Sequence, residues 1–394
     1  MSPAARCACG RRRRDSFAAS EMAQESPTSM RISIDDLEDM ARGAAFLGTG
    51  GGGDPYIGRL LAKHAIQEFG MPQIIEPDDL DDDAAVFTSA MLGAPTVLVE
   101  KAASGDDIDL SINRLSEVIG KKPAAISPIE IGGMNSMIPI VAAARMGLPI
   151  VNSDGMGRAF PEIQMVTYNV YGVSATPAVI VDEHLESVVV ETSDSKRAED
   201  LVRVCAIQMG LSVMISCYPL TGRQVKDYGV SGTLGIALGI GRALTEGRKR
   251  GDPVEAMQAY LRTTQYYNRC KVLFDGKITD VRRETTRGFS IGHCDIESID
   301  GSSDRLQLEF QNENLVARLN GHTVAIVPDL ITVVDRESGE PITTEALKYG
   351  QRVKVVGTSA APVMRTPESL AVFGPRSFGI EEDFVRIEEI HPDV

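Results

Sequence analysis

Charged side chains follow two apolar runs of the sequence, at points where strands of a parallel sheet are expected to end. Glu130 comes after AAISPI, and Asp154, Arg158 and Glu162 lie together in NSDGMGRAFPE. Open parallel sheets bind their ligands at the carboxyl ends of strands. A carboxylate at an apolar strand end is either paired with a basic group or has a raised pKa, which suits general acid–base chemistry. The catalytic candidates are therefore Asp154, Glu130, Glu162 and Arg158.

Each candidate also has a purely structural interpretation. Gly155 and Gly157 indicate a tight turn that exposes backbone donors, and Arg158 is suited to holding a carboxylate or polarising a carbonyl. The alternative for NSDGMGRAFPE is a capped turn with an internal Asp–Arg ion pair. The alternative for Glu130 is a satisfied buried salt bridge.

The stretch LGTGGGGDP (47–55) contains the spacing G-x-G-x-x-G of a dinucleotide-binding turn, but a run of four glycines makes this match weak. A dinucleotide turn follows a strand, whereas residues 33–48 predict a helix with Ser33 as its N-cap. Asp54 and Pro55 then begin a second helix where a phosphate would otherwise lie. We therefore interpret the glycines as a binding loop for a small neutral or carbonyl-bearing ligand, with a helix–helix turn as the alternative.

Backbone N–H groups and a few polar side chains make up the predicted binding set. Asp54 is either a plain N-cap or a residue that faces the ligand, and Arg376 comes from the closing stretch of the chain. The substrate-binding candidates are Gly50, Gly51, Gly52, Gly53, Asp54, Asn135 and Arg376.

A metal site stays open as an alternative, although no other cofactor is indicated. The sequence has no H-x-H, H-E-x-x-H or C-x-x-C pattern, so a conventional zinc site has no support. A divalent metal with oxygen ligands would use Asp54, Glu130 and Asp154, with Glu162 as a further ligand.

Alternating strands and helices are expected to position these residues. The order implies a parallel sheet with crossover helices. The predicted elements are strands at 84–92, 124–131 and 148–154, helices near 107–120 and at 137–147, a hairpin at 177–183 and 187–192, and a strand at 211–219.

The pattern changes after about residue 272, where short alternating runs and turns such as DG, NG and ESGE predict an antiparallel β module. The predicted fold class is α/β: a three-layer N-terminal domain (31–272) with a mainly parallel sheet, followed by a β-barrel-like domain (273–394). The last segment is expected to return to the α/β body.

Charge and composition exclude several classes of protein. The chain of 394 residues has a net charge of −15, which disfavours binding to nucleic acid or to an anionic membrane, and no apolar run reaches the ~18–20 residues of a membrane span. The six cysteines show no regular framework, so we expect reduced thiols and a cytoplasmic location. Residues 1–30 are predicted to form a disordered, Arg-rich tail.

The order of long motifs resembles the S-methyl thiohydantoin desulfurase family. The motifs are LGTGGGGDP, EIGGMNS, NSDGMGRAFPE, SGTLGIALGIGRAL, VPDLITVVDRESGEPI and TPESLAVFGPRSFG. The resemblance covers about residues 31–390 and implies an α/β domain followed by a β-barrel-like domain.

The resemblance also implies hydrolytic removal of sulfur from a thiohydantoin, free or S-methylated, with a small heterocycle as substrate. We expect Asp154 to be the base or a metal ligand with Glu130 as its partner, and Glu162 to be the acid. Arg158 and the glycine loop would hold the ring. The alternatives are a cyclic-amide hydrolase of the hydantoin or oxoproline type, and a non-catalytic subunit of a hydantoinase complex. The expected partners are a second copy of the chain and a hydantoinase-type protein.

Overall fold

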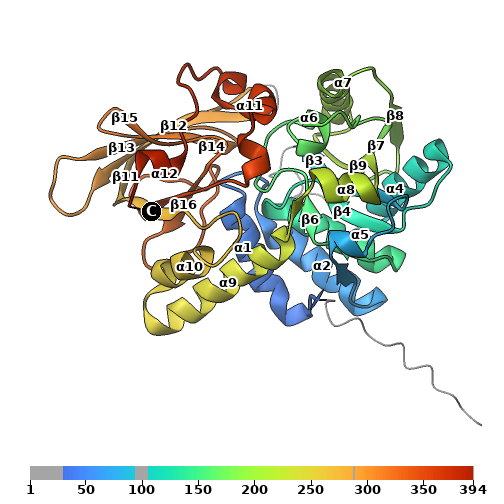
Figure 1. Ribbon diagram of the computed structural model, residues 1–394, viewed down its shortest axis with the longest axis horizontal. Coiled ribbons are helices and arrows are strands. Elements are labelled where there is room, and N and C mark those ends of the chain that lie inside the picture. Colours follow the sequence, from blue (N-terminus) through green and yellow to red (C-terminus); the bar gives the residue numbers. More distant parts are fainter. Residues whose placement is uncertain (1–29, 94–104, 287–288, 394) are drawn as a thin grey trace, which may run out of the picture.

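Two large sheets organise the chain, one with eight strands and one with seven (Figure 1). The computed structural model describes residues 30–93, 105–286 and 289–393. The predicted Arg-rich tail lies outside the described residues, apart from Met30. The predicted combination of an α/β part with an antiparallel β part is confirmed. We call the part built on the eight-stranded sheet the N-terminal domain and the part built on the seven-stranded sheet the C-terminal domain.

The eight-stranded sheet forms the middle layer of the N-terminal domain. In spatial order its strands are β1 (Met30–Arg31), β2 (Gln73–Ile75), β5 (Ile150–Val151), β4 (Ala125–Pro128), β3 (Ala85–Gly93), β9 (Ser212–Thr221), β7 (Ala178–Val181) and β8 (Ser187–Val190). Strands β2, β5, β4 and β3 are parallel, and the antiparallel strands β9, β7 and β8 extend the sheet. The β7–β8 hairpin is the one that the sequence predicted.

Helices cover both sides of this sheet, with α4 and α5 on one side and α7 on the other (Figure 1). Their apolar residues recur with the period of a helix and so lie on one face. The Asp194 side chain caps α7 by accepting a hydrogen bond from the Arg197 N–H. The helices of this domain are α1 (Leu37–Leu47), α2 (Pro55–Phe69), α4 (Asp106–Ile119), α5 (Ile138–Met146), α6 (Thr167–Val170), α7 (Ser195–Gln208), α8 (Gly222–Tyr228), α9 (Thr233–Arg250) and α10 (Pro253–Leu261).

Small residues let α1 and α9 pack backbone to backbone. A Cβ on Gly241 would lie 1.8 Å from the Asp39 carbonyl oxygen, and one on Gly43 would lie 1.7 Å from that of Ala237. Only glycine permits this approach, because a Cβ at either position would overlap the other helix. This explains why α1 and α9 contain glycine although it lowers helical propensity. The close packing fixes the end of α1, and therefore the place where the glycine loop begins.

The strand predicted at 148–154 is divided in the structure. Residues Ile150–Val151 form β5 in the large sheet, whereas Ser153–Asp154 form β6 and pair with β10 (Val230–Ser231) in a separate two-stranded sheet. The chain turns away at Asn152, whose side chain donates to Glu76 at 2.8 Å and whose carbonyl accepts the Gly232 N–H at 2.7 Å. Asp154 consequently lies off the large sheet, at the end of β6 and just before a turn.

The C-terminal domain is an antiparallel sheet that curls into a half-barrel around its own core. Its strands, in spatial order, are β15 (His322–Ile326), β14 (Glu313–Leu319), β13 (Arg305–Gln311), β12 (Phe289–Ser298), β11 (Cys270–Thr286), β17 (Arg352–Thr358) and β16 (Leu330–Asp335). Alternate residues such as Leu306, Leu308 and Phe310 of β13 are buried inside the curl. The hairpin of β13 and β14 points its tip, Asn312, toward the N-terminal domain.

The last segment runs back against the α/β body. It comprises the short helices α11 (Pro367–Phe373) and α12 (Ile387–Ile390) with 3-10 turns before and between them. The ring of Phe373 stacks on that of Phe160 with 4.9 Å between centroids. No helix in the three described ranges is both long and apolar enough to cross a membrane.

Candidate active site

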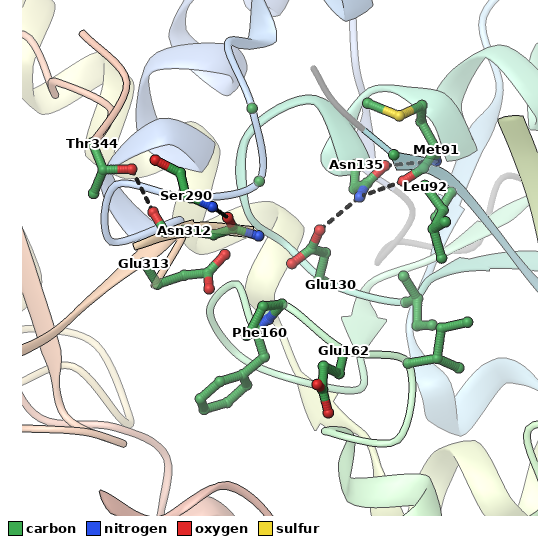
Figure 2. A pocket seen from close by; sticks show the side chains of 18 of the residues that line it. Met91, Leu92, Glu130, Asn135, Phe160, Glu162, Ser290, Asn312, Glu313 and Thr344 are labelled. Atoms are coloured by element: carbon green, nitrogen blue, oxygen red, sulfur yellow. Dashed lines mark hydrogen bonds between the residues drawn. The ribbon is translucent and has the colours of Figure 1, made fainter. Parts of the chain in front are cut away.

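A cavity of about 520 Å³ opens between the two domains, within the roughly 300–1,000 Å³ that small-molecule sites occupy. The glycine loop, the end of β3 and the turn after β4 form one side, and the tip of the β13–β14 hairpin forms the other. Met91, Leu92, Ile129, Phe160 and Ile163 supply much of its apolar wall. The polar groups gather where the two domains meet (Figure 2).

Glu130 is the carboxylate that the N-terminal domain contributes to this cavity. It follows β4 and is 5% exposed. Burial raises the pKa of Glu130 to about 8, although a hydrogen bond from Asn135 opposes the rise. Its Oε1 accepts that bond at 2.6 Å, and its Oε2 has no hydrogen-bonding partner among the described residues. The carboxyl group is thus held by Asn135 on one side, and the backbone of Phe160 also opposes the rise of its pKa.

Glu313 is the carboxylate that the C-terminal domain contributes. It is the first residue of β14 and is 2% exposed. Burial, and then the negative charge of Glu130, hold the pKa of Glu313 well above its usual range, while the charge of Arg158 opposes the rise. Its Oε2 also lacks a partner within the described ranges. Figure 2 shows the carboxyl groups of Glu130 and Glu313 pointing toward each other.

Asn135 lies in the 3-10 turn Gly133–Ser136 and orients Glu130. Its Oδ1 accepts the Met91 N–H at 2.8 Å, and its Nδ2 donates to the Met91 carbonyl at 3.1 Å as well as to Glu130. Both amide protons are therefore used. Asn135 lines the cavity, as expected of a binding residue, but its bonds serve the carboxyl group and the β3 backbone.

The glycine loop follows a helix, as its sequence context predicted, and it joins the two domains. The Thr49 carbonyl accepts the Asn314 N–H at 2.8 Å, and the Gly50 carbonyl accepts the Thr344 N–H at 2.9 Å. A Cβ on Gly51 would lie 1.9 Å from Oε1 of Glu313. The glycines line the cavity from Gly50 to Gly53, and the absence of a side chain at Gly51 makes room for the Glu313 carboxyl group.

Asp154 organises a turn behind the cavity. Its Oδ2 accepts N–H bonds from Ile131, Met156 and Gly157 at 2.8–3.0 Å. The side chain is fully buried, and burial raises the pKa of Asp154 to about 7. It does not line the cavity. The structure brings it beside the backbone of Ile131, next to Glu130, and its charge contributes to the raised pKa of Glu130.

Arg158 links the two domains. It is 1% exposed, and Nη1 donates to the carbonyls of Pro328 and Asp329, both at 3.0 Å. Its Nη2 donates to Thr49 Oγ1 at 2.8 Å and to the Asn314 carbonyl at 3.3 Å. Burial lowers the pKa of Arg158 to about 10, so the guanidinium stays charged at neutral pH. Its donors are spent on the protein, away from the cavity surface.

The other predicted site residues lie at the edge of the cavity or outside it. Glu162 lines the cavity, but it accepts a bond from Gln164 and lies 3.7 Å from the Lys196 ammonium. Asp54 is exposed and caps α2 by accepting the Tyr56 N–H at 2.9 Å. Arg376 is exposed and pairs with Asp383 at 3.0 Å. Neither Asp54 nor Arg376 lines the cavity.

The residues considered for a metal do not gather into one site. Asp54 caps a helix at the surface, and one oxygen of Asp154 is taken up by three N–H groups. Across residues 30–93, 105–286 and 289–393, no three or more His, Cys, Asp or Glu side chains form a group that could hold a metal ion.

Sequence reasoning did not single out Asn312 and Glu313. Their signal is the polar break QNEN between the apolar runs LQLEF and LVARL. Four polar residues in a row interrupt the alternation of a strand, and they mark the hairpin tip that faces the other domain.

Fold and cavity together define a two-domain protein with a buried pair of acids between its domains. Two family models match the chain: S-Me-THD-like, N-terminal domain, over residues 35–192, and S-Me-THD-like, C-terminal domain, over residues 193–387. The chain therefore belongs to the S-methyl thiohydantoin desulfurase family, whose name points to an enzyme acting on S-methyl thiohydantoin.

A crystal structure of a protein from Chromobacterium violaceum has the same fold. The two chains share 24% identity with a TM-score of 0.75, and the match covers 91% of this chain and all of the other. No curated protein is significantly similar to the chain.

Proposed function

We propose that this protein hydrolyses a thiohydantoin or S-methyl thiohydantoin to the hydantoin, with release of sulfide or methanethiol. The observation that carries the proposal is the pair of buried acids, Glu130 and Glu313, which face each other in the cavity and each keep one oxygen without a partner in the described chain. Membership of the family supports the choice of substrate.

The two acids are suited to different parts of the reaction. Asn135 donates to Glu130, which favours the ionised form, and with a pKa of about 8 this group can accept a proton as the pH approaches 8. The pKa of Glu313 lies well above its usual range because of burial and the charge of Glu130, so this group keeps its proton and can donate it. Glu130 is therefore the base, and Glu313 is the acid.

For an S-methyl thiohydantoin, the proposed reaction steps balance in atoms and protons. Glu130 takes a proton from water as the water oxygen bonds to the ring carbon that carries sulfur. The electron pair of the carbon–nitrogen double bond moves to the ring nitrogen, which takes the proton of Glu313. The carbon–sulfur bond then breaks, the new hydroxyl returns a proton to Glu313 as the carbonyl forms, and Glu130 protonates the departing sulfur. The products are the hydantoin and methanethiol.

The test is a release assay with purified protein, in which a thiol reagent detects methanethiol or sulfide and mass spectrometry detects the hydantoin. Glu130→Gln and Glu313→Gln should each lower kcat/KM by about 10²-fold or more. Glu309→Gln is the control, because Glu309 lies on the same hairpin outside the cavity and pairs with Arg318. It should keep near wild-type activity.

Glu162→Gln separates this assignment from the one made on sequence alone. A large loss in Glu162→Gln, with near wild-type rates in Glu130→Gln and Glu313→Gln, would overturn the roles of base and acid assigned to Glu130 and Glu313. Cleavage of hydantoin itself, with no sulfur released from the thio compound, would instead support a cyclic-amide hydrolase.

A further inference from the structure

We propose that Asn312 is a catalytic residue of this site, and that its side-chain amide donates a hydrogen bond to the substrate's ring carbonyl oxygen. This inference rests on the proposed function. Asn312 forms the tip of the β13–β14 hairpin, between Gln311 and Glu313, and lines the cavity. It is thus adjacent in sequence to one of the two reacting acids.

Hydrogen bonds fix the direction of the Asn312 amide. The Asn312 N–H donates to the Ser290 carbonyl at 2.8 Å, and Oδ1 accepts the Ser290 N–H at 2.8 Å. The Asn312 carbonyl accepts the Thr344 hydroxyl at 2.6 Å. Because an N–H group faces Oδ1, the other end of the amide must be the nitrogen. Figure 2 shows this nitrogen directed toward the space between Glu130 and Glu313.

A second asparagine in the same domain, Asn320, has the same role in its hairpin turn but lies outside the cavity. Asn320, at the tip of the β14–β15 hairpin, has φ +50°, close to the φ +58° of Asn312. Its N–H donates to the Arg305 carbonyl and its Oδ1 accepts the Arg305 N–H at 3.0 Å, as Asn312 does with Ser290. The Nδ2 of Asn320 is used by Asp304 at 2.8 Å. The Nδ2 of Asn312 donates to no described residue.

The cavity is also lined by the hydroxyl groups of Ser290 and Thr343 and by the guanidinium groups of Arg203 and Arg283, each guanidinium having five N–H donors. The guanidinium of Arg203 is bound to Glu199 and to the Pro161 carbonyl, and that of Arg283 to the carbonyls of Glu345 and Leu347. Asn135 uses both of its amide protons on Met91 and Glu130. A ring carbonyl that enters beside two carboxyl groups needs a donor, and Asn312 supplies one.

The chemistry of the ring gives this donor a catalytic effect. In the tautomer of an S-methyl thiohydantoin whose carbon–nitrogen double bond lies next to the ring carbonyl, the nitrogen that receives the electron pair is bonded to the carbonyl carbon. Negative charge that builds on this nitrogen during attack by water therefore spreads to the carbonyl oxygen. A preorganised donor on that oxygen binds the transition state more tightly than the ground state.

Asn312→Asp is the sharpest test. Aspartate keeps an oxygen for the Ser290 N–H and tolerates the left-handed backbone, but it replaces the donor with an acceptor. We expect kcat/KM for methanethiol release to fall by about 10²–10³-fold, with little change in Tm. Asn312→Gly, which suits φ +58°, should give a similar loss if aspartate disturbs the fold. Asn320→Asp is the matched control and should retain wild-type kcat/KM.

Calorimetry of binding of the product hydantoin tests the donor role of Asn312 independently of turnover, so the failure of this inference can be distinguished from the failure of the proposed function. If the wild type turns over and Asn312→Asp loses less than tenfold, the inference is overturned. If the wild type releases no sulfur but binds hydantoin, and Asn312→Asp binds it at least tenfold more weakly, the proposed function fails and the donor role stands. A wild type that neither turns over nor binds hydantoin overturns both.

Discussion

Glu130 is a carboxylic acid kept from water by an apolar strand end and held by one amide. Burial is the main reason that its pKa rises to about 8. A group whose pKa is raised on folding stabilises the protein fully below its unfolded pKa, near 4.5. That stability is lost as the pH rises through the folded pKa, because the folded state must then bury a charge.

Glu130→Gln should therefore change the pH dependence of stability. Glutamine keeps the acceptor for Asn135 and carries no charge, so the variant should become more stable than the wild type as the pH rises from 5 to 9. The difference in the free energy of unfolding should approach about 5 kcal/mol at pH 9, since the pKa rises from 4.5 to about 8 and each pKa unit corresponds to about 1.4 kcal/mol. Urea unfolding at several pH values measures it. Curves for wild type and variant that run parallel from pH 5 to 9 would contradict the assignment.

At the scale of elements, the glycine loop leaves space for the Glu313 carboxyl group because Gly51 has no side chain. Gly51 does not have a left-handed backbone, so alanine fits its φ, but the added Cβ would lie 1.9 Å from Oε1 of Glu313. The Cβ would also lie 2.5 Å from Cδ and 2.6 Å from Cγ of Glu313, so we expect the whole side chain to move while the fold survives.

Gly51→Ala should thus lower kcat/KM by about tenfold or more, since small displacements of a reacting group are costly, while Tm changes by only a few degrees. Gly235→Ala is the control, because its Cβ would meet atoms no nearer than 3.6 Å. It should leave turnover intact and stabilise α9 slightly. Equal activity in Gly51→Ala and the wild type would mean that the loop does not position Glu313.

At the scale of the whole molecule, one buried arginine joins the glycine loop to elements of the other domain. The guanidinium of Arg158 binds Thr49 of the glycine loop and carbonyls of Asn314, Pro328 and Asp329, and it lies 4.6 Å from the ring centroid of Phe160. The two acids come from different domains, so we expect this contact to help set their relative position.

Arg158→Met should leave buried carbonyl oxygens without donors and lower the free energy of unfolding by about 3–5 kcal/mol, as measured by urea unfolding. Arg376→Met provides the comparison. Arg376 and Asp383 form an exposed ion pair, with side chains 65% and 86% exposed, so its loss should stay within about 0.5 kcal/mol. A similar small loss in Arg158→Met would show that the domains are held by other contacts.

The sequence by itself determined the two kinds of sheet, the helix before the glycine loop and the caps at its ends, because these follow from periodicity and from local hydrogen bonds. Ser33 caps the 3-10 turn Ile34–Asp36 that leads into α1, and Asp54 caps α2, the helix after the glycine loop. Glu130 could also be found, since a carboxylate at an apolar strand end is visible without a structure.

Only the tertiary structure decided which charged groups meet. Glu130 and Glu313 are far apart in the chain and come together because the β13–β14 hairpin reaches the end of the parallel sheet. The chain turns at Asn152, so Asp154 lies outside the large sheet. The guanidinium of Arg158 donates to carbonyl groups of the other domain. Local patterns carry no information on contacts between domains, because such contacts depend on how the two surfaces fit together.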